Sequence, residues 1–260
     1  MSTDARWIAR LAKTAFVLVL AIVASSAFIR LSAGVADASQ AALEIARIAH
    51  RISASVAGLL VLLAAGLVLT RDSSRWPDIA LAGAALFVML ALAWVGRYSG
   101  PNATAAVLFC NLAGGLALST LLWAVAARAS TPGDAVPLGE LAMLAPLALL
   151  GIGLQCVTGA MTVTGFAKVG AAHHLSGIVA FGLCAWLAIR LGRSPSTKSV
   201  GRLIIALAGF QASLGIAAWA FALPLWLVLS HNIGAALLLA ALAHVLSPAR
   251  PPNAGMLPIP

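Results

Sequence analysis

The chain has 260 residues, of which 62% are hydrophobic and only 9% are charged. A soluble domain carries roughly 45–50% apolar and about 25% charged residues, so this composition excludes a soluble enzyme, a disordered chain and a disulfide scaffold. The net charge of +9 reflects 16 basic against 7 acidic residues, and no basic run with interleaved aromatics indicates nucleic-acid binding. Because about 20 apolar residues cross a bilayer as a helix, the chain has room for about eight spans.

Eight apolar runs follow one another along the chain, separated by short segments with turn residues. The first run lacks a small-residue cleavage site, which favours an uncleaved first helix. The proline-rich tail, residues 248–260, is expected to be disordered. The predicted fold is an all-α integral membrane protein with transmembrane helices at residues 12–29, 45–69, 79–95, 105–127, 141–163, 171–191, 203–222 and 225–246.

The distribution of Lys and Arg predicts the orientation of these spans. With the N-terminus inside, eleven of the basic residues fall on inside segments and five on outside ends. The positive-inside rule therefore places both termini in the cytoplasm, in a bacterial-type inner membrane.

Two motifs recur along the chain and indicate an internal repeat. The pattern A-H-[RH]-[IL]-S-x-x-V-A occupies residues 49–57 and 172–180, 123 residues apart. The segments around Cys110-Asn111 and His231-Asn232 also match, 121 residues apart. Two matches at nearly one offset predict two tandem four-helix bundle repeats in the same orientation. The first repeat covers residues 1–129 and the second covers residues 138–247.

Ionisable side chains inside a bilayer are costly and mark function by default. His50, His173 or His174, and His231 are each expected about six residues inside the outer end of an even-numbered helix, at a shared depth of roughly 9 Å. The repeat would pair the second helix with the fourth and the sixth with the eighth, and two imidazoles facing each other across a bundle typically hold a six-coordinate haem. A packing role for any single histidine is the alternative. Repeat alignment selects His173 over its neighbour.

Several short motifs, in order and at the right spacing, resemble the haem A synthase family, whose members convert haem O to haem A for cytochrome oxidase. The resemblance covers nearly the whole chain. The motifs are Gln211-Ala-Ser-Leu-Gly215, Leu223-Pro-Leu-Trp226 followed by His231, Arg30-Leu-Ser-Ala-Gly34, Gln155-Cys-Val-Thr-Gly159 and His50-Arg51.

The resemblance implies a role for each half of the chain. It implies that His173 and His231 hold a haem b in the C-terminal half, with His174 near a propionate or the interface. It places haem O in the N-terminal half, where a ring methyl is oxidised to a formyl group and His50 is the catalytic, haem-facing residue. Arg30 and Arg51 are candidates for pairing with propionates, because Arg binds carboxylates bidentately; interfacial charges are the alternative.

The N-terminal half departs from the family pattern twice. Arg47 stands where the family usually has a Glu, and Glu44 is a poor substitute because it lies about 120° away on a helix. Cys110 replaces the second histidine, and it is either a weak thiolate ligand for iron or a packing residue. Cys156 and Cys184 are read as packing residues.

These departures leave two functions open. The first is a haem A synthase-like oxidoreductase with haem b as cofactor and haem O as substrate. The second is a haem b-binding membrane protein of the same family without that activity, acting as an assembly factor or electron carrier. Expected partners are the haem substrate and membrane lipid, with haem O synthase, oxidase assembly factors and a second copy of the chain as further candidates. A transporter is disfavoured because no span is broken at mid-membrane.

Overall fold

The computed structural model describes residues 2–32, 39–71, 76–100, 102–130, 141–221 and 224–247. Within these residues it is all-helical, and all eight helices are long and apolar enough to cross a membrane. They are α1 (Thr3–Ser32), α2 (Gln40–Thr70), α3 (Trp76–Gly96), α4 (Ala105–Ser130), α5 (Leu141–Val163), α6 (Gly170–Leu191), α7 (Lys198–Ala220) and α8 (Leu225–Val245). The predicted all-α membrane fold is therefore confirmed. The predicted disordered tail lies outside the described residues.

Helices α1, α2 and α7 begin at least five residues earlier than the apolar runs predict. The first turns of α1 bury Ile8 and Ala9 in an apolar cluster, so the polar N-terminal segment continues the helix. Helix α2 begins at Gln40 because the hydroxyl of Ser39 accepts a hydrogen bond from the main-chain N–H of Ala42 at 3.4 Å. Hydropathy marks the part of a helix that crosses the bilayer, whereas capping and local packing set where the helix begins.

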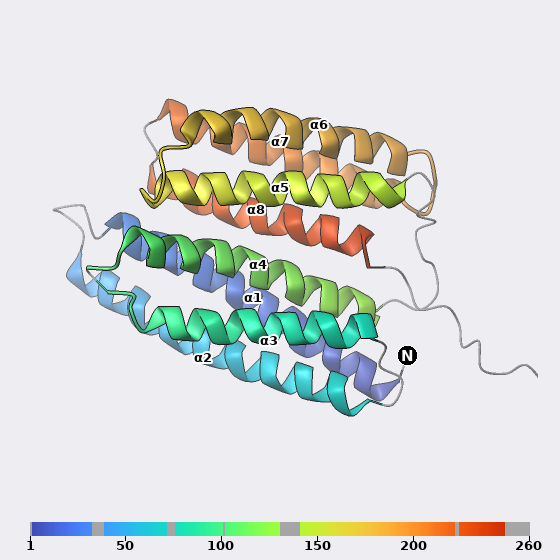
Figure 1. Cartoon of the computed structure of the whole chain (residues 1–260), viewed down its shortest axis with the longest axis horizontal. Helices are drawn as coiled ribbons and strands as arrows, with labels where there is room; N and C mark the ends of the chain where they lie inside the picture. The colour runs from blue at the N-terminus through green and yellow to red at the C-terminus, as the bar shows by residue number, and fades with distance from the viewer. Residues whose placement is uncertain are drawn as a thin grey trace, which may run out of the picture.

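The helices form two groups of four that lie side by side, with α1–α4 in one and α5–α8 in the other (Figure 1). Within each group, every helix packs against the helices before and after it, and the first packs against the last. The expected pairs α2–α4 and α6–α8 do not pack directly; each pair lies diagonally across its group. This arrangement is compatible with the tandem repeat, which stays a prediction.

The seam between the groups is formed mainly by α8, which packs against α1 and α4 as well as against α5 and α7. Its buried side chains include Leu238 and Leu242, which lie in one core with Leu122 of α4. Large apolar side chains instead cover the outside of the molecule, as the 71% exposure of Phe87 and the 72% exposure of Ile178 illustrate. Buried small residues with exposed bulky ones suit helices that pack closely within a bilayer.

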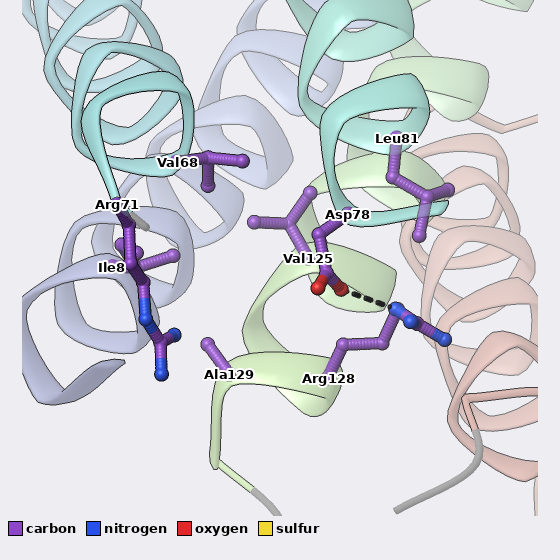
Figure 2. Close-up of a pocket in the computed structure, with 8 residues that line it drawn as sticks. All are labelled: Ile8, Val68, Arg71, Asp78, Leu81, Val125, Arg128 and Ala129. Atoms are coloured by element: carbon purple, nitrogen blue, oxygen red, sulfur yellow. Dashed lines mark hydrogen bonds and ion pairs between the residues drawn. The ribbon is translucent and has the colours of Figure 1, made fainter. Parts of the chain in front are cut away.

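A buried ion pair closes one end of the N-terminal group. Asp78 in the first turn of α3 accepts a hydrogen bond from Nε of Arg128 in the last turn of α4, at 2.7 Å. Figure 2 shows this pair in a pocket that Arg71, at the end of α2, also lines. An acidic residue at a helix start and a basic residue at a helix end both complement the helix dipoles. The pair therefore ties α3 to α4, at the opposite end of the group from His50 and Cys110.

Candidate functional site

The candidate ligand residues gather toward one end of the molecule. The even-numbered helices α2, α4, α6 and α8 all begin at the end shown at the left of Figure 1. His50, His173 and His231 lie ten, three and six residues after the first residue of α2, α6 and α8. The expected common spacing of about six residues therefore holds only for His231. Helix α2 begins further ahead of its histidine, and α6 begins closer to its histidine.

The ring of His173 is fixed by residues of α5. Its Nδ1 lies 3.1 Å from the main-chain carbonyl of Gln155 and 3.3 Å from the hydroxyl of Thr158. That hydroxyl donates its own proton to the carbonyl of Leu154 at 3.0 Å. Both oxygens are thus acceptors for Nδ1, which must carry the ring proton, so Nε2 carries the free lone pair. This is the tautomer that binds a metal through Nε2.

Two glycines on odd-numbered helices make room for the histidine rings. A methyl group added at Gly159 of α5 would lie 2.8 Å from Cε1 of His173, and one at Gly215 of α7 would lie 3.1 Å from Cε1 of His231. Both rings therefore rest on the bare backbone of the preceding helix. Gly159 and Gly215 each follow a glutamine by four residues, so the glutamine and the glycine lie on one helix face.

His231 differs from His173 in its polar partners. Its Nδ1 is buried without a hydrogen-bond partner among the described residues. The side-chain amide of Gln211 donates to the main-chain carbonyl of His231 at 2.9 Å and does not bond the ring. His173 and His231 lie on α6 and α8, which are diagonal to each other in the C-terminal group.

His174 lies away from this arrangement. It is exposed, and its ring meets Trp219 of α7 edge-on, with the ring centroids 6.2 Å apart. The two adjacent histidines therefore have distinct surroundings, as a 100° step on a helix requires. His173 is the one whose tautomer is set by α5.

In the N-terminal group, His50 is half-buried and contacts α1. Its Nδ1 lies 3.1 Å from the hydroxyl of Ser25, and that hydroxyl donates to the carbonyl of Ile22 at 3.1 Å. Because the hydroxyl proton is used on Ile22, Ser25 accepts from Nδ1 of His50. Nε2 of His50 is thereby left with its lone pair, as in His173.

The two departures from the family pattern have different surroundings. Arg47 forms an ion pair with Glu44 one turn earlier, with 3.8 Å between Nη1 and Oε2. Helix α2 does extend through Glu44, so this carboxylate is engaged with the arginine on the helix surface. Cys110 is exposed on α4, while its neighbour Asn111 donates to the hydroxyl of Ser99 at 2.6 Å.

The two candidate propionate partners are not equivalent. Arg30 lies in the last turn of α1, and its Nε and Nη2 atoms are buried without a hydrogen-bond partner among the described residues. Arg51, next to His50, is exposed. A guanidinium that is enclosed without a partner is costly, so Arg30 is the better candidate for an anionic ligand.

Sequence reasoning missed the residues that position the histidines. Gln155, Gly159 and Gln211 appear in the family-like motifs, but the motifs do not reveal which of them touches a ring. Their spacing of one helical turn is the signal that was available. Thr158 also lies in one of these motifs and Ser25 lies outside them, and only the packing of α5 on α6 and of α1 on α2 shows their role.

Two comparisons with known proteins found a match, and the family match lies in the C-terminal group. Residues 166–243 match the family of cytochrome oxidase assembly proteins. A 74-residue stretch is 40% identical to a protein named haem A synthase from Shewanella oneidensis, and it covers 28% of this chain and 22% of that relative. The chain is thus aligned with less than a quarter of the relative's length.

The family match contains some of the residues described above and excludes others. His173, His174, Gln211 and His231 lie inside residues 166–243, whereas His50 and Cys110 lie outside. The resemblance to the haem A synthase family is supported by these matches.

Proposed function

We propose that this chain is a member of the haem A synthase family and a membrane oxidoreductase that converts haem O to haem A, which the matches to a cytochrome oxidase assembly family and to a haem A synthase support. A ring methyl becomes a formyl group, so one methyl and one water give one formyl, four protons and four electrons. The oxygen comes from water and the electrons leave to an external electron acceptor. The protein must therefore hold the substrate, manage protons and hold a redox centre.

The C-terminal group, residues 138–247, is proposed to hold haem b, which would supply one-electron transfer. His173 of α6 and His231 of α8 would hold its iron through ring nitrogens. The tautomer of His173 carries this assignment, because its Nδ1 donates to the Gln155 carbonyl at 3.1 Å and leaves Nε2 able to bind iron. The buried Nδ1 of His231, which has no hydrogen-bond partner among the residues that the structure describes, and the glycines beneath both rings also fit a ligand pair.

The N-terminal group, residues 1–129, is proposed to hold haem O. His50 would face the substrate with Nε2 and serve as the catalytic residue, since Ser25 keeps the proton on Nδ1. Arg30 would bind a propionate through its buried guanidinium nitrogens. Arg51 would bind the other propionate from the exposed side of α2, and His174 would reach a propionate of haem b. Iron ligation by Cys110 stays the weaker assignment, and its exposure on α4 does not support a packing role either.

The setting proposed for this activity is a bacterial-type inner membrane with both termini in the cytoplasm. Haem O must reach the site from the enzyme that makes it, and haem A must pass on to the oxidase. Haem O synthase and oxidase assembly factors are therefore the proposed partners, and a second copy of this chain is a further candidate.

The test is to produce the full chain in cells that also make haem O, extract the haems and separate them by chromatography. We expect haem A or its hydroxymethyl precursor together with haem b. The His50→Ala variant is the matched control, because it should retain haem b and lose the oxidised products. Haem b alone in the unaltered chain would instead support the second function, a haem b-binding protein without synthase activity. Absence of any haem would contradict both.

A further inference from the structure

The side chain of Gln155 lies directly against the nitrogen of His173 that would bind iron. Nε2 of His173 is 3.3 Å from Nε2 of Gln155. Because Nδ1 of the ring donates to the carbonyl of the same glutamine, Nε2 of the ring can only accept. The glutamine amide is a donor, so this contact is a hydrogen bond to the lone pair that a metal would use.

The amide is held in this orientation by α6 itself. The hydroxyl of Ser176 donates to Oε1 of Gln155 at 2.5 Å, which turns the amide nitrogen toward the ring. Space for the amide comes from Gly177, where an added methyl group would lie only 2.9 Å from Nε2 of Gln155. Ser176 and Gly177 of α6 thus hold the side chain of Gln155 against the ring of His173.

We propose that Gln155 is a placeholder for iron at His173. It hydrogen-bonds the coordinating nitrogen when no metal is bound, keeps the ring neutral and in the metal-binding tautomer, and leaves that nitrogen when haem iron binds. The proposal rests on the proposed function, in which His173 is an axial ligand of haem b. No covalent chemistry on the protein is involved, because one lone pair exchanges an N–H donor for iron.

The glutamine of α7, Gln211, gives a comparison with Gln155. Gln211 occupies the corresponding place on α7, four residues before Gly215, and its amide donates to the main-chain carbonyl of His231 at 2.9 Å. It therefore does not compete for a ring nitrogen. Haem binding should break the hydrogen bond of Gln155 to the His173 ring and leave that of Gln211 intact.

The experiment measures the affinity of the full chain for ferric haem b. Haem-free protein, purified in detergent from haem-starved cells, is titrated with ferric haem b and followed by its Soret absorption. We expect Gln155→Ala to bind haem b about two- to tenfold more tightly, since one hydrogen bond no longer has to be broken. The main-chain carbonyl of residue 155 and the hydroxyl of Thr158 remain, so the tautomer of His173 is kept.

The direction of the effect separates a placeholder from a structural residue. Loss of a structural contact would weaken haem binding, whereas loss of a competitor strengthens it. Gln211→Ala is the matched control and should bind haem b no more tightly than the unaltered chain. Gln155→Asn, whose shorter side chain withdraws the amide from the ring, should tighten binding as well and serves if Gln155→Ala does not fold.

Unchanged or weaker binding in the Gln155 variants overturns the placeholder while the proposed function stands, provided the unaltered chain shows a six-coordinate haem spectrum. Equal tightening in Gln211→Ala also overturns it, because that amide does not touch a ring. An unaltered chain that binds no haem b overturns both the placeholder and the proposed function.

Discussion

In both four-helix groups, glycines of the even-numbered helices receive a side chain from the preceding helix, but that side chain is polar in one group and apolar in the other. In the C-terminal group, glycines of α6 and α8 (Gly177 and Gly234) receive the side chains of Gln155 and Gln211 from the preceding helix. In the N-terminal group, Gly114 of α4 receives Leu92 of α3, whose Cδ2 would lie 2.7 Å from an added methyl group. The same small-residue packing thus holds an amide in one group and an aliphatic side chain in the other.

This difference indicates that a metal-binding histidine also needs hydrogen-bond partners for its second ring nitrogen and space for its ring. His173 has a carbonyl and a hydroxyl for Nδ1 and a glycine beneath its ring. Cys110, which matches His231 in the predicted repeat, is exposed, and an ordinary apolar contact lies one turn further along its helix. At this point α3 packs against α4 through an aliphatic side chain, and among the described residues of the N-terminal group His50 has a ligand-like setting.

The largest expected effect comes from removing a proposed axial ligand. Residues that merely support a metal ligand typically contribute 10–100-fold to affinity, so His173→Ala and His231→Ala should each weaken haem b binding by more than about a hundredfold. His50→Ala should leave haem b binding unchanged, because His50 lies in the other group. A pyridine haemochrome assay of haem per protein measures all three.

His244→Ala is the control for this comparison, because His244 lies in the last turn of α8, away from the other histidines. It should retain full haem b content. Full haem b content in both His173→Ala and His231→Ala would mean that the C-terminal group does not use these ligands.

The sequence predicts the helices well and the histidine surroundings poorly. Composition and hydropathy are enough to place all eight spans, because a bilayer demands long apolar helices. They do not predict that α1 begins at Thr3, because that start depends on burying Ile8 and Ala9 against other helices.

Side-chain partners depend on how one helix is registered against the next. That register follows from close approaches such as Gly151 of α5 against Ala180 of α6, where an added methyl group would lie 3.6 Å from the Cα of Ala180. Nothing in the spacing of the histidines encodes it. The contacts of Gln155, Thr158 and Ser25 with the rings therefore emerge only when the helices are packed together.

The glycine beneath His173 offers an intermediate test of the same comparison. Gly159→Ala places a methyl group 2.8 Å from Cε1 of His173, so the ring must shift and its hydrogen bonds to α5 must lengthen. Overpacking of this kind typically costs about 1–3 kcal/mol, and we expect haem b affinity to fall about tenfold. Gly215→Ala should have a smaller effect because its methyl group would lie 3.1 Å from the ring of His231.

Gly153 provides the matched control on the same helix. An added methyl group at Gly153 would meet nothing within 4 Å, so Gly153→Ala should leave haem b affinity unchanged. Haem titration of the three variants measures the effect. Equal affinities for Gly159→Ala and Gly153→Ala would show that haem binding by His173 does not depend on the space that Gly159 leaves for the ring.

The smallest expected effects concern the hydroxyls that contact Nδ1. Ser25→Ala removes the side-chain hydrogen bond of His50, so the ring loses part of its preference for one tautomer. A net hydrogen bond of about 1 kcal/mol predicts a roughly threefold to tenfold drop in oxidised haem products. Thr158→Ala should change haem b affinity by less than about twofold, since the main-chain carbonyl of Gln155 still accepts from Nδ1 of His173.

The measurement for this pair is the ratio of haem A and its precursor to haem O for Ser25→Ala, and haem titration for Thr158→Ala. Ser25→Ala should leave haem b content untouched, because its effect is confined to the N-terminal group. We infer that a side chain, Ser25, holds the ring of His50, whereas the main-chain carbonyl of Gln155 holds the ring of His173. A loss of haem b in Ser25→Ala, or a large loss of affinity in Thr158→Ala, would contradict this difference. A main-chain carbonyl persists through every substitution except one that moves the backbone, so the C-terminal site should tolerate changes that the N-terminal site does not.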